Sequence, residues 1–198
     1  MGEDIRWVLH GAAMTTSQSP MLDTLRDGFA RVVYTHKTHE KQIEALGREV
    51  TAYKWCQLIA MALTSGGALW VIIGQQRICE VVTAVLAVIS LGITIYGWSL
   101  DPKSRIALHR LCAKELWHIR EGYLNLISDL MLGRIGDDQA AVTRDALVEQ
   151  LATLYRFAPD TTPKAYRRAC EALQVSRELS FTDEEIDTFL PLGLRKKQ

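Results

Sequence analysis

Two long stretches of the chain lack charged residues altogether. Residues 55–74 and 81–99 contain no Asp, Glu, Lys or Arg, and the short segment between them carries only Arg77 and Glu80. At about 1.5 Å of rise per residue, a helix over either stretch spans the roughly 30 Å hydrocarbon core of a bilayer. Because the linker is so short, the second helix must turn straight back. The pattern therefore predicts an antiparallel transmembrane hairpin over residues 55–99.

Two alternatives to a transmembrane hairpin are disfavoured by the same pattern. Helices of soluble proteins nearly always show one charged face, and neither stretch has one. A signal peptide is not expected, because the first apolar stretch starts near residue 55 and the N-terminus, Met1-Gly2-Glu3-Asp4, is short of basic and apolar residues. We therefore expect the mature protein to keep the hairpin and to lie in a lipid bilayer.

Basic residues on both sides of the hairpin predict its orientation. Eight of them flank the two stretches, against Arg77 alone in the turn: Lys37, Lys41, Arg48, Lys54, Lys103, Arg105, Arg110 and Lys114. Because cytoplasmic flanks carry the excess of Lys and Arg, both termini are expected in the cytoplasm. Amphipathic aromatic residues then lie at the two interfaces, with Tyr53, Trp55, Tyr96 and Trp98 at the inner one and Trp70 nearer the outer one.

Helix signals continue on both sides of the hairpin. Three sites place a capping residue before a proline at the first helical position: Ser19-Pro20, Asp101-Pro102 and Thr162-Pro163. After Pro20 the next proline is Pro102, so a cytosolic helix at 20–54 is expected to run unbroken into the first span. The resulting rod would be roughly 80 Å long. The break at Asp101 gives the second span a separate hinge.

Three further helices are expected after the long helix that starts at Pro102 and ends near Gly133. Apolar stripes indicate two of them, in segments 138–158 and 163–177. The stripes are Leu147, Leu151, Leu154 and Ala158 in the first, and Tyr166, Ala169, Cys170 and Leu173 in the second. Thr182 and Glu185 have the spacing of a capping box, which opens a short last helix that Pro191 ends.

The chain is therefore predicted to be an all-α membrane protein with a two-helix transmembrane hairpin and a cytosolic helical assembly. No segment alternates well enough to be a strand. The predicted parts are an N-terminal tail at 1–19, a cytosolic helix at 20–54, the hairpin at 55–99 and a cytosolic helical region at 100–198. The 23 basic and 23 acidic residues balance, which argues against nucleic acid as the main ligand.

Enzyme chemistry finds almost no support in the sequence. There is no glycine-rich phosphate loop, no His-Glu-x-x-His, no Gly-x-Ser-x-Gly and no Cys-x-x-Cys. The four cysteines, Cys56, Cys79, Cys112 and Cys170, are too scattered for a disulfide framework. His36 and His39 lack an evident partner ligand, so we interpret them, with His109 and His118, as solvated or interhelical polar positions. The protein is not expected to be an enzyme or to hold a metal or cofactor.

Small and hydroxyl-bearing residues share one face of each predicted span. Steps of four, three and four separate Thr83, Ala87, Ser90 and Thr94 on the second span. On the first span, Gln57, Met61, Thr64 and Ala68 repeat this spacing, with Ser65, Gly66 and Gly67 adjacent. Such stripes let helices pack closely, which is one interpretation. The other is a pore.

In the pore interpretation, five residues line the lumen and the small triplet packs the helices. The lining residues are Thr64, Thr83, Ala87, Ser90 and Thr94, and the packing residues are Ser65, Gly66 and Gly67. Two helices cannot enclose water, so a pore requires a homo-oligomeric ring. The absence of charge in the spans argues against a proton relay and permits a weakly selective or dewetting-gated channel.

A basic helix, a hairpin and a characteristic following segment together resemble a known family. The basic helix runs from Phe29 to Lys54 and the segment from Asp101 to Arg110. A cytosolic motif begins within this segment and continues past it. It comprises Arg105, His109, Arg110, Arg120 and Tyr123, and Leu116 lies between Arg110 and Arg120. This layout resembles the SLATT family, the two-transmembrane effectors associated with SMODS and SLOG proteins, over residues 25 to about 190.

The resemblance implies an effector of a bacterial anti-phage, abortive-infection system. Such a protein would form an oligomeric pore in the bacterial inner membrane and disrupt that membrane on a signal. The signal would come from a partner, as a nucleotide second messenger or through a signal-generating protein. The family supplies no catalytic residues. A membrane-anchored scaffold without a pore is the alternative, and an enzyme with its site on the cytosolic helices is the least favoured interpretation.

Overall fold

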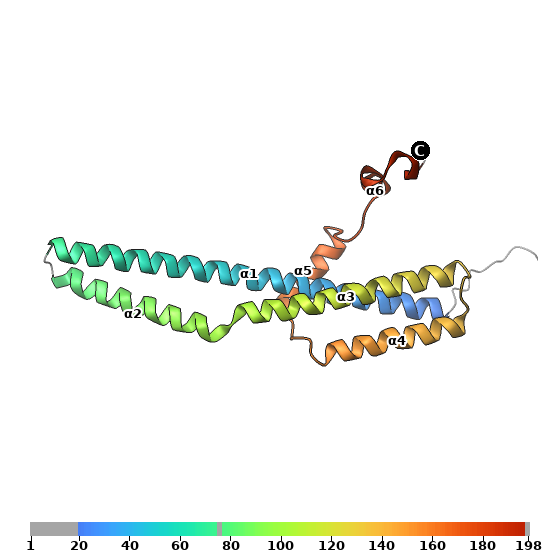
Figure 1. The fold of residues 1–198 in the computed structure, drawn as a ribbon, viewed down its shortest axis with the longest axis horizontal. Coiled ribbons are helices and arrows are strands. Elements are labelled where there is room, and N and C mark those ends of the chain that lie inside the picture. The colour runs from blue at the N-terminus through green and yellow to red at the C-terminus, as the bar shows by residue number, and fades with distance from the viewer. Residues whose placement is uncertain (1–19, 75–76, 197–198) are drawn as a thin grey trace, which may run out of the picture.

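The computed structural model describes residues 20–74 and 77–196, and every regular element in these ranges is helical (Figure 1). The predicted all-α fold is confirmed. The elements are α1 Pro20–Gly74, α2 Arg77–Leu100, α3 Pro102–Met131, α4 Asp137–Tyr155, α5 Pro163–Gln174, α6 Asp183–Phe189 and the 3-10 helix Leu192–Leu194. The predicted tail at 1–19, with its capping Ser19, and the side chains of Cys79 and Trp98 lie outside the described part of the chain.

One helix of 55 residues, α1, runs the length of the molecule (Figure 1). The unbroken rod predicted from Pro20 into the first span is therefore confirmed. Its second half packs beside the antiparallel α2, and its first half packs against α3 and α5. Since both halves belong to one helix, α1 connects the hairpin rigidly to the rest of the protein.

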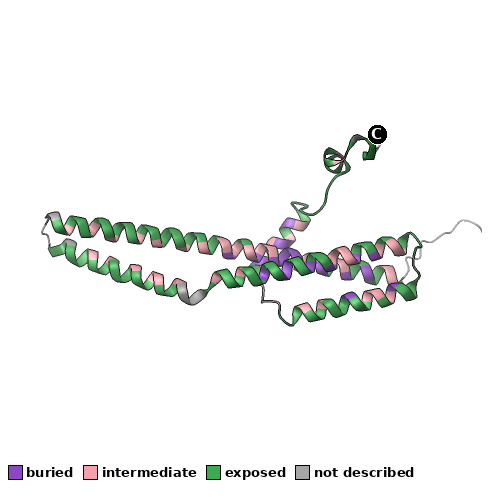
Figure 2. Ribbon diagram, in the orientation of Figure 1, coloured by how far each residue is buried: buried purple, intermediate pink, exposed green. Residues whose placement is uncertain are grey.

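Most residues of the two hairpin helices are exposed (Figure 2). In each of the two helices, no part of the most apolar stretch of 18 residues is buried within the chain. Ile72 of α1 and Val88 of α2 are 77% and 70% exposed. A soluble core would bury such helices, so the described residues do not fit that alternative. Both helices are long and apolar enough to cross a membrane.

A single residue, Asp101, separates α2 from α3. Its backbone has φ 33° and ψ 58°, in the left-handed region, and its carboxylate accepts a hydrogen bond from the Ser104 backbone N–H at 3.4 Å. Pro102 follows as the first residue of α3, where its missing N–H costs no helical bond. The chain changes direction here (Figure 1). The predicted caps at Thr162 and Thr182 also form.

The hydrophobic core lies between α1, α3 and α4, away from the hairpin (Figure 2). Leu25 and Val32 of α1 and Leu116 of α3 are fully buried. Tyr123 lies so close to Gly28 that a Cβ atom there would come within 2.9 Å of the tyrosine Cε1. The predicted α4 stripe contacts this core, through Leu147, Leu151, Leu154 and Ala158.

The buried face of α5 shares only Ala169 with the predicted stripe. The structure buries Ala165, Ala169 and Ala172, whereas Tyr166 is exposed, and Cys170 and Leu173 are only half-buried. Alanine side chains let α5 lie close on α1, which a face carrying a tyrosine would prevent. The Tyr166 ring instead lies at the edge of the contact, with its centroid 6.4 Å from that of Tyr34.

Candidate functional site

The polar stripe of α2 contacts α1 at two positions within the chain. A Cβ atom on Gly67 would lie 2.5 Å from the Thr83 Oγ1, so the two backbones approach closely there. Farther along the hairpin, the Gln57 side-chain amide donates a hydrogen bond to the Thr94 hydroxyl at 3.2 Å. Two of the five predicted pore-lining residues are therefore in contact with the other span of the same hairpin.

The remaining predicted pore-lining residues are less enclosed. Ala87 is exposed, and Thr64 and Ser90 are half-buried. The Thr64 hydroxyl donates a hydrogen bond to the Ala60 carbonyl of its own helix at 2.8 Å, which leaves its lone pairs available. Four of the five residues are thus half-buried along the line on which α1 and α2 meet, which we call the hairpin seam, and Ala87 is exposed beside it. Their assignment to a lumen stays a prediction.

The predicted packing triplet divides into one residue that contacts α2 and two that face outward. Gly67 contacts Thr83, as described above. Ser65 is exposed, and a Cβ atom on Gly66 would meet nothing within 4 Å. Ser65 and Gly66 are therefore open for contact with another copy of the hairpin.

Replacing Gly67 with leucine is expected to force the two spans apart, because even the Cβ atom would overlap Thr83. Overpacking of this kind typically costs about 1–3 kcal/mol. The midpoint of thermal unfolding in detergent should fall by roughly 5 °C. Gly66→Leu adds the same side chain to the same helix one residue away, in open space, and should keep the wild-type midpoint. Equal midpoints for the two variants would show that the Gly67 contact carries no stability.

A buried polar cluster joins α1 to α3 on the side away from the hairpin. The Nδ1 atoms of His39 and His109 lie 2.9 Å apart, and the Cys112 Sγ lies 3.5 Å from the His39 Nε2. All three side chains are buried. At this distance one imidazole must donate and the other accept, which requires the accepting ring to be neutral. We call these three residues the histidine cluster.

Burial keeps the histidine cluster uncharged at neutral pH. It lowers the pKa of His39 to about 4, and repulsion from His109 and His36 adds to the effect. Burial, with a contribution from Arg105, lowers the pKa of His109, and burial raises the pKa of the Cys112 thiol to about 11. Within the described ranges, no three His, Cys, Asp or Glu residues are grouped to hold a metal. The cluster is thus a buried contact between α1 and α3.

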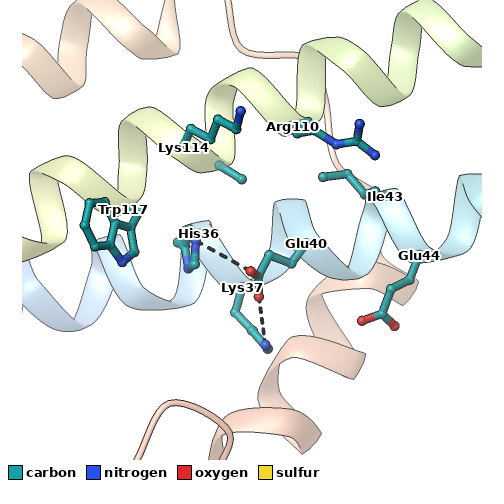
Figure 3. A pocket seen from close by; sticks show the side chains of 9 residues that line it. His36, Lys37, Glu40, Ile43, Glu44, Arg110, Lys114 and Trp117 are labelled. Carbon is teal, nitrogen blue, oxygen red and sulfur yellow. Dashed lines mark hydrogen bonds and ion pairs between the residues drawn. The ribbon is translucent and has the colours of Figure 1, made fainter.

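A cavity of about 600 Å³ lies beside the cluster, between α1 and α3 (Figure 3). On its α1 side, Lys37 pairs with Glu40 at 2.7 Å and with Glu178 at 2.6 Å. Its α3 side presents Arg110 and Lys114. The remaining lining residues are His36, Ile43, Glu44, Ala113 and Trp117.

Unsatisfied polar groups make this cavity a candidate binding site. The buried His36 Nδ1 has no hydrogen-bond partner. Burial lowers the pKa of His36, against the attraction of Glu40 and with the repulsion of Arg120 and Lys37. Neither Arg110 nor Lys114 has an ion-pair partner in the part of the chain that the structure describes. A negatively charged group placed here would meet these two cations and an imidazole, with the Glu40 and Glu44 carboxylates on the α1 wall.

The family comparison covers all of these features. The model of SMODS and SLOG-associating 2TM effector domain family 4 matches residues 21–185, from the first turn of α1 into α6. The chain belongs to this family. Comparison with curated proteins and with solved structures finds no match. The resemblance to SLATT proteins is thus confirmed, and the SLATT domain includes the hairpin seam, the histidine cluster and the cavity of Figure 3.

The SLATT assignment and the two apolar helices agree on a membrane protein. The family is described as a two-transmembrane effector domain that associates with SMODS and SLOG proteins. The two helices that are long and apolar enough to span a membrane both lie within the matched residues. As a SLATT domain, the chain is therefore an effector domain of SMODS- and SLOG-associated systems.

The five residues of the predicted cytosolic motif are spread along α3 of the SLATT domain. His109 belongs to the histidine cluster, and Tyr123 is buried in the core. Arg120 is half-buried and binds the neighbouring Glu121 carboxylate at 2.6 Å. Arg110 lines the cavity of Figure 3, and Arg105 lines a second cavity nearer the hairpin. Two residues of the motif, His109 and Tyr123, therefore attach α3 to α1, and two others, Arg110 and Arg105, line two different cavities.

Proposed function

We propose that the chain is an oligomeric pore-forming effector of a bacterial anti-phage system, which disrupts the inner membrane and stops the infected cell. The hairpin seam supports this proposal most directly, because it places hydroxyl and small side chains along an otherwise apolar and uncharged hairpin. Two helices cannot enclose water, so several copies would form a closed ring. The proposed action is an opening of the ring, and we assign no catalytic residue.

The orientation and trigger belong to the same proposal. The basic flanks of the hairpin favour a multi-pass topology with both termini in the cytoplasm. The signal would be a nucleotide second messenger or a signal-generating protein partner, and it would open the ring by binding the open form better than the closed one. The unbroken α1 would pass movement of the cytosolic helices to the first span, while Asp101 would let α2 move separately.

A membrane-anchored scaffold is the second candidate, and one observation favours it. Thr83 and Thr94 are already engaged with α1 inside one chain, so part of the stripe is explained by packing alone. In that case the hairpin would only hold a helical docking platform at the membrane. Any hairpin of similar length would then serve.

Membrane potential and dye entry in infected bacteria distinguish the two candidates. Cells that carry the chain in its native genetic context are expected to depolarise and take up dye after phage infection. A variant with residues 55–99 replaced by an unrelated hairpin should insert, as a carbonate-washed membrane fraction would show, without depolarisation or protection. Protection by this variant would contradict the pore and support the scaffold.

A further inference from the structure

A second cavity, of about 690 Å³, lies where the hairpin meets the cytosolic helices. Its walls are formed by α1, by the end of α2 and by the first residues of α3. Lys54 is the last charged residue before the first apolar stretch, and Asp101 is the first after the second. Both line the cavity. In a membrane-inserted chain, the cavity therefore lies at the level of the lipid headgroups.

Three cations give this cavity its chemical character. They are Lys54 on α1 and Lys103 and Arg105 on α3, and all three are exposed. None has an ion-pair partner among residues 20–74 and 77–196. Two carboxylates, Asp101 and Glu49, also line the cavity. The Asp101 carboxylate already caps α3 by accepting the Ser104 N–H, and three cations against two carboxylates leave the cavity with a net positive charge that favours an anionic ligand.

The rest of the lining, which we call the floor of the cavity, is largely apolar. Val50 and Tyr53 of α1 and Gly97 of α2 contribute to it. The Tyr53 ring lies over Gly97 in the space a Cβ atom would occupy, and its hydroxyl donates a hydrogen bond to the Ile93 carbonyl at 2.7 Å. An apolar floor beside three cations fits a molecule with a charged head and an apolar tail. A soluble phosphate would use only the cations.

We call this second cavity, at the junction of α2 and α3, the elbow cavity. We propose that it binds an anionic phospholipid, with the lipid phosphate between Lys54, Lys103 and Arg105. Basic pockets at the ends of transmembrane helices are where anionic lipid headgroups bind membrane proteins. The inference depends on insertion of the hairpin but not on pore formation. It holds for either orientation, because headgroups cover both faces of the bilayer.

Lipid binding at this place would act on the hinge between α2 and α3. Asp101 has the left-handed backbone that residues other than glycine seldom adopt. A phosphate shared by Lys54 on α1 and by Lys103 and Arg105 on α3 would tie the two helices together across that hinge. The bound lipid would therefore oppose a change in the angle between the hairpin and the cytosolic helices.

Native mass spectrometry of the full-length chain in a neutral detergent tests the proposal. Added dioleoylphosphatidylglycerol should be retained far better than dioleoylphosphatidylcholine. Replacing both Lys103 and Arg105 with alanine should lower phosphatidylglycerol retention about thirty-fold, since each cation contributes roughly fivefold. Lys164→Ala with Arg167→Ala removes two exposed cations from α5 and should leave retention unchanged.

Lys54→Gln, on the opposite wall, should lower retention independently. Circular dichroism verifies the fold of each variant.

Three results would overturn this assignment. Equal retention of the two lipids would show that the headgroup charge is not recognised. Undiminished phosphatidylglycerol binding in both the Lys103→Ala, Arg105→Ala variant and the Lys54→Gln variant would place the lipid elsewhere. Displacement of the lipid by millimolar glycerol 3-phosphate would show that the cations serve a soluble phosphate instead.

Discussion

Bacteria that produce the chain with both Ser90→Leu and Thr94→Leu are expected to keep their membrane potential after phage infection, whereas wild-type cells depolarise. Both positions lie on the hairpin seam. Leucine there would replace hydroxyl groups with bulkier apolar side chains, and an apolar constriction of a narrow pore excludes water. Insertion should not suffer, since leucine is among the residues that membrane helices favour most. Membrane potential, dye entry and the carbonate-washed membrane fraction are measured on the same culture.

The contact between the spans requires a separate control for this double variant. Thr94 accepts a hydrogen bond from Gln57, so its replacement also removes a contact within the hairpin. Gln57→Leu removes the same bond and keeps both hydroxyls of α2. It should therefore depolarise infected cells as the wild type does. Depolarisation by the double variant would eliminate the pore-lining assignment, and loss of depolarisation in Gln57→Leu would assign the effect to packing.

Acidification from pH 7.5 to pH 5 is expected to lower the stability of the helical bundle outside the hairpin. The pKa of His39 falls from 6.5 to about 4 on folding. Below pH 6.5 the unfolded state therefore binds a proton that the folded state does not, so the stability present above pH 6.5 is lost as the pH falls toward 4. At pH 5 His39 alone contributes a loss of about 2 kcal/mol. The lowered pKa values of His36 and His109 act in the same direction.

Thermal unfolding in detergent at several pH values measures this effect, with an expected fall of roughly 5 °C at pH 5. The pair variant His39→Gln with His109→Gln should show a smaller dependence on pH. His118→Gln changes an exposed histidine of the same helix and should preserve the full dependence. Glu178, whose pKa the bonded Lys37 and Lys41 lower, loses its contribution only at more acidic pH. An undiminished fall in the pair variant would assign the acid sensitivity to other groups.

Local rules predicted the helices well, because their signals lie within a few residues of each other. Three helix starts are determined by neighbouring residues alone, without distant parts of the chain. They are Asp101-Pro102, Thr162-Pro163 and the capping box at Thr182. The hairpin likewise follows from the absence of charge over two stretches. These features need only the chemistry of the backbone and the bilayer.

The packing partners could not be predicted in the same way. His109 and Cys112 are three residues apart and share a face of α3, but their partner His39 lies 70 residues before His109. Which turn of α1 meets which turn of α3 is decided by the whole interface, including the Tyr123 contact with Gly28. The buried face of α5 was missed for a related reason. Hydrophobicity favoured Tyr166, whereas close approach to α1 selects the alanines.

The length of α1 also determines where a partner can meet this effector. Its first part, over residues 20–54, is about 50 Å long at the standard helical rise. If the hairpin stands upright in the bilayer, the farthest turns of the bundle lie well clear of the headgroups, beyond the reach of an ordinary peripheral domain resting on the membrane. A bulky activating protein can therefore approach from the side without touching lipid. The effector would then receive its signal at a distance from the membrane surface.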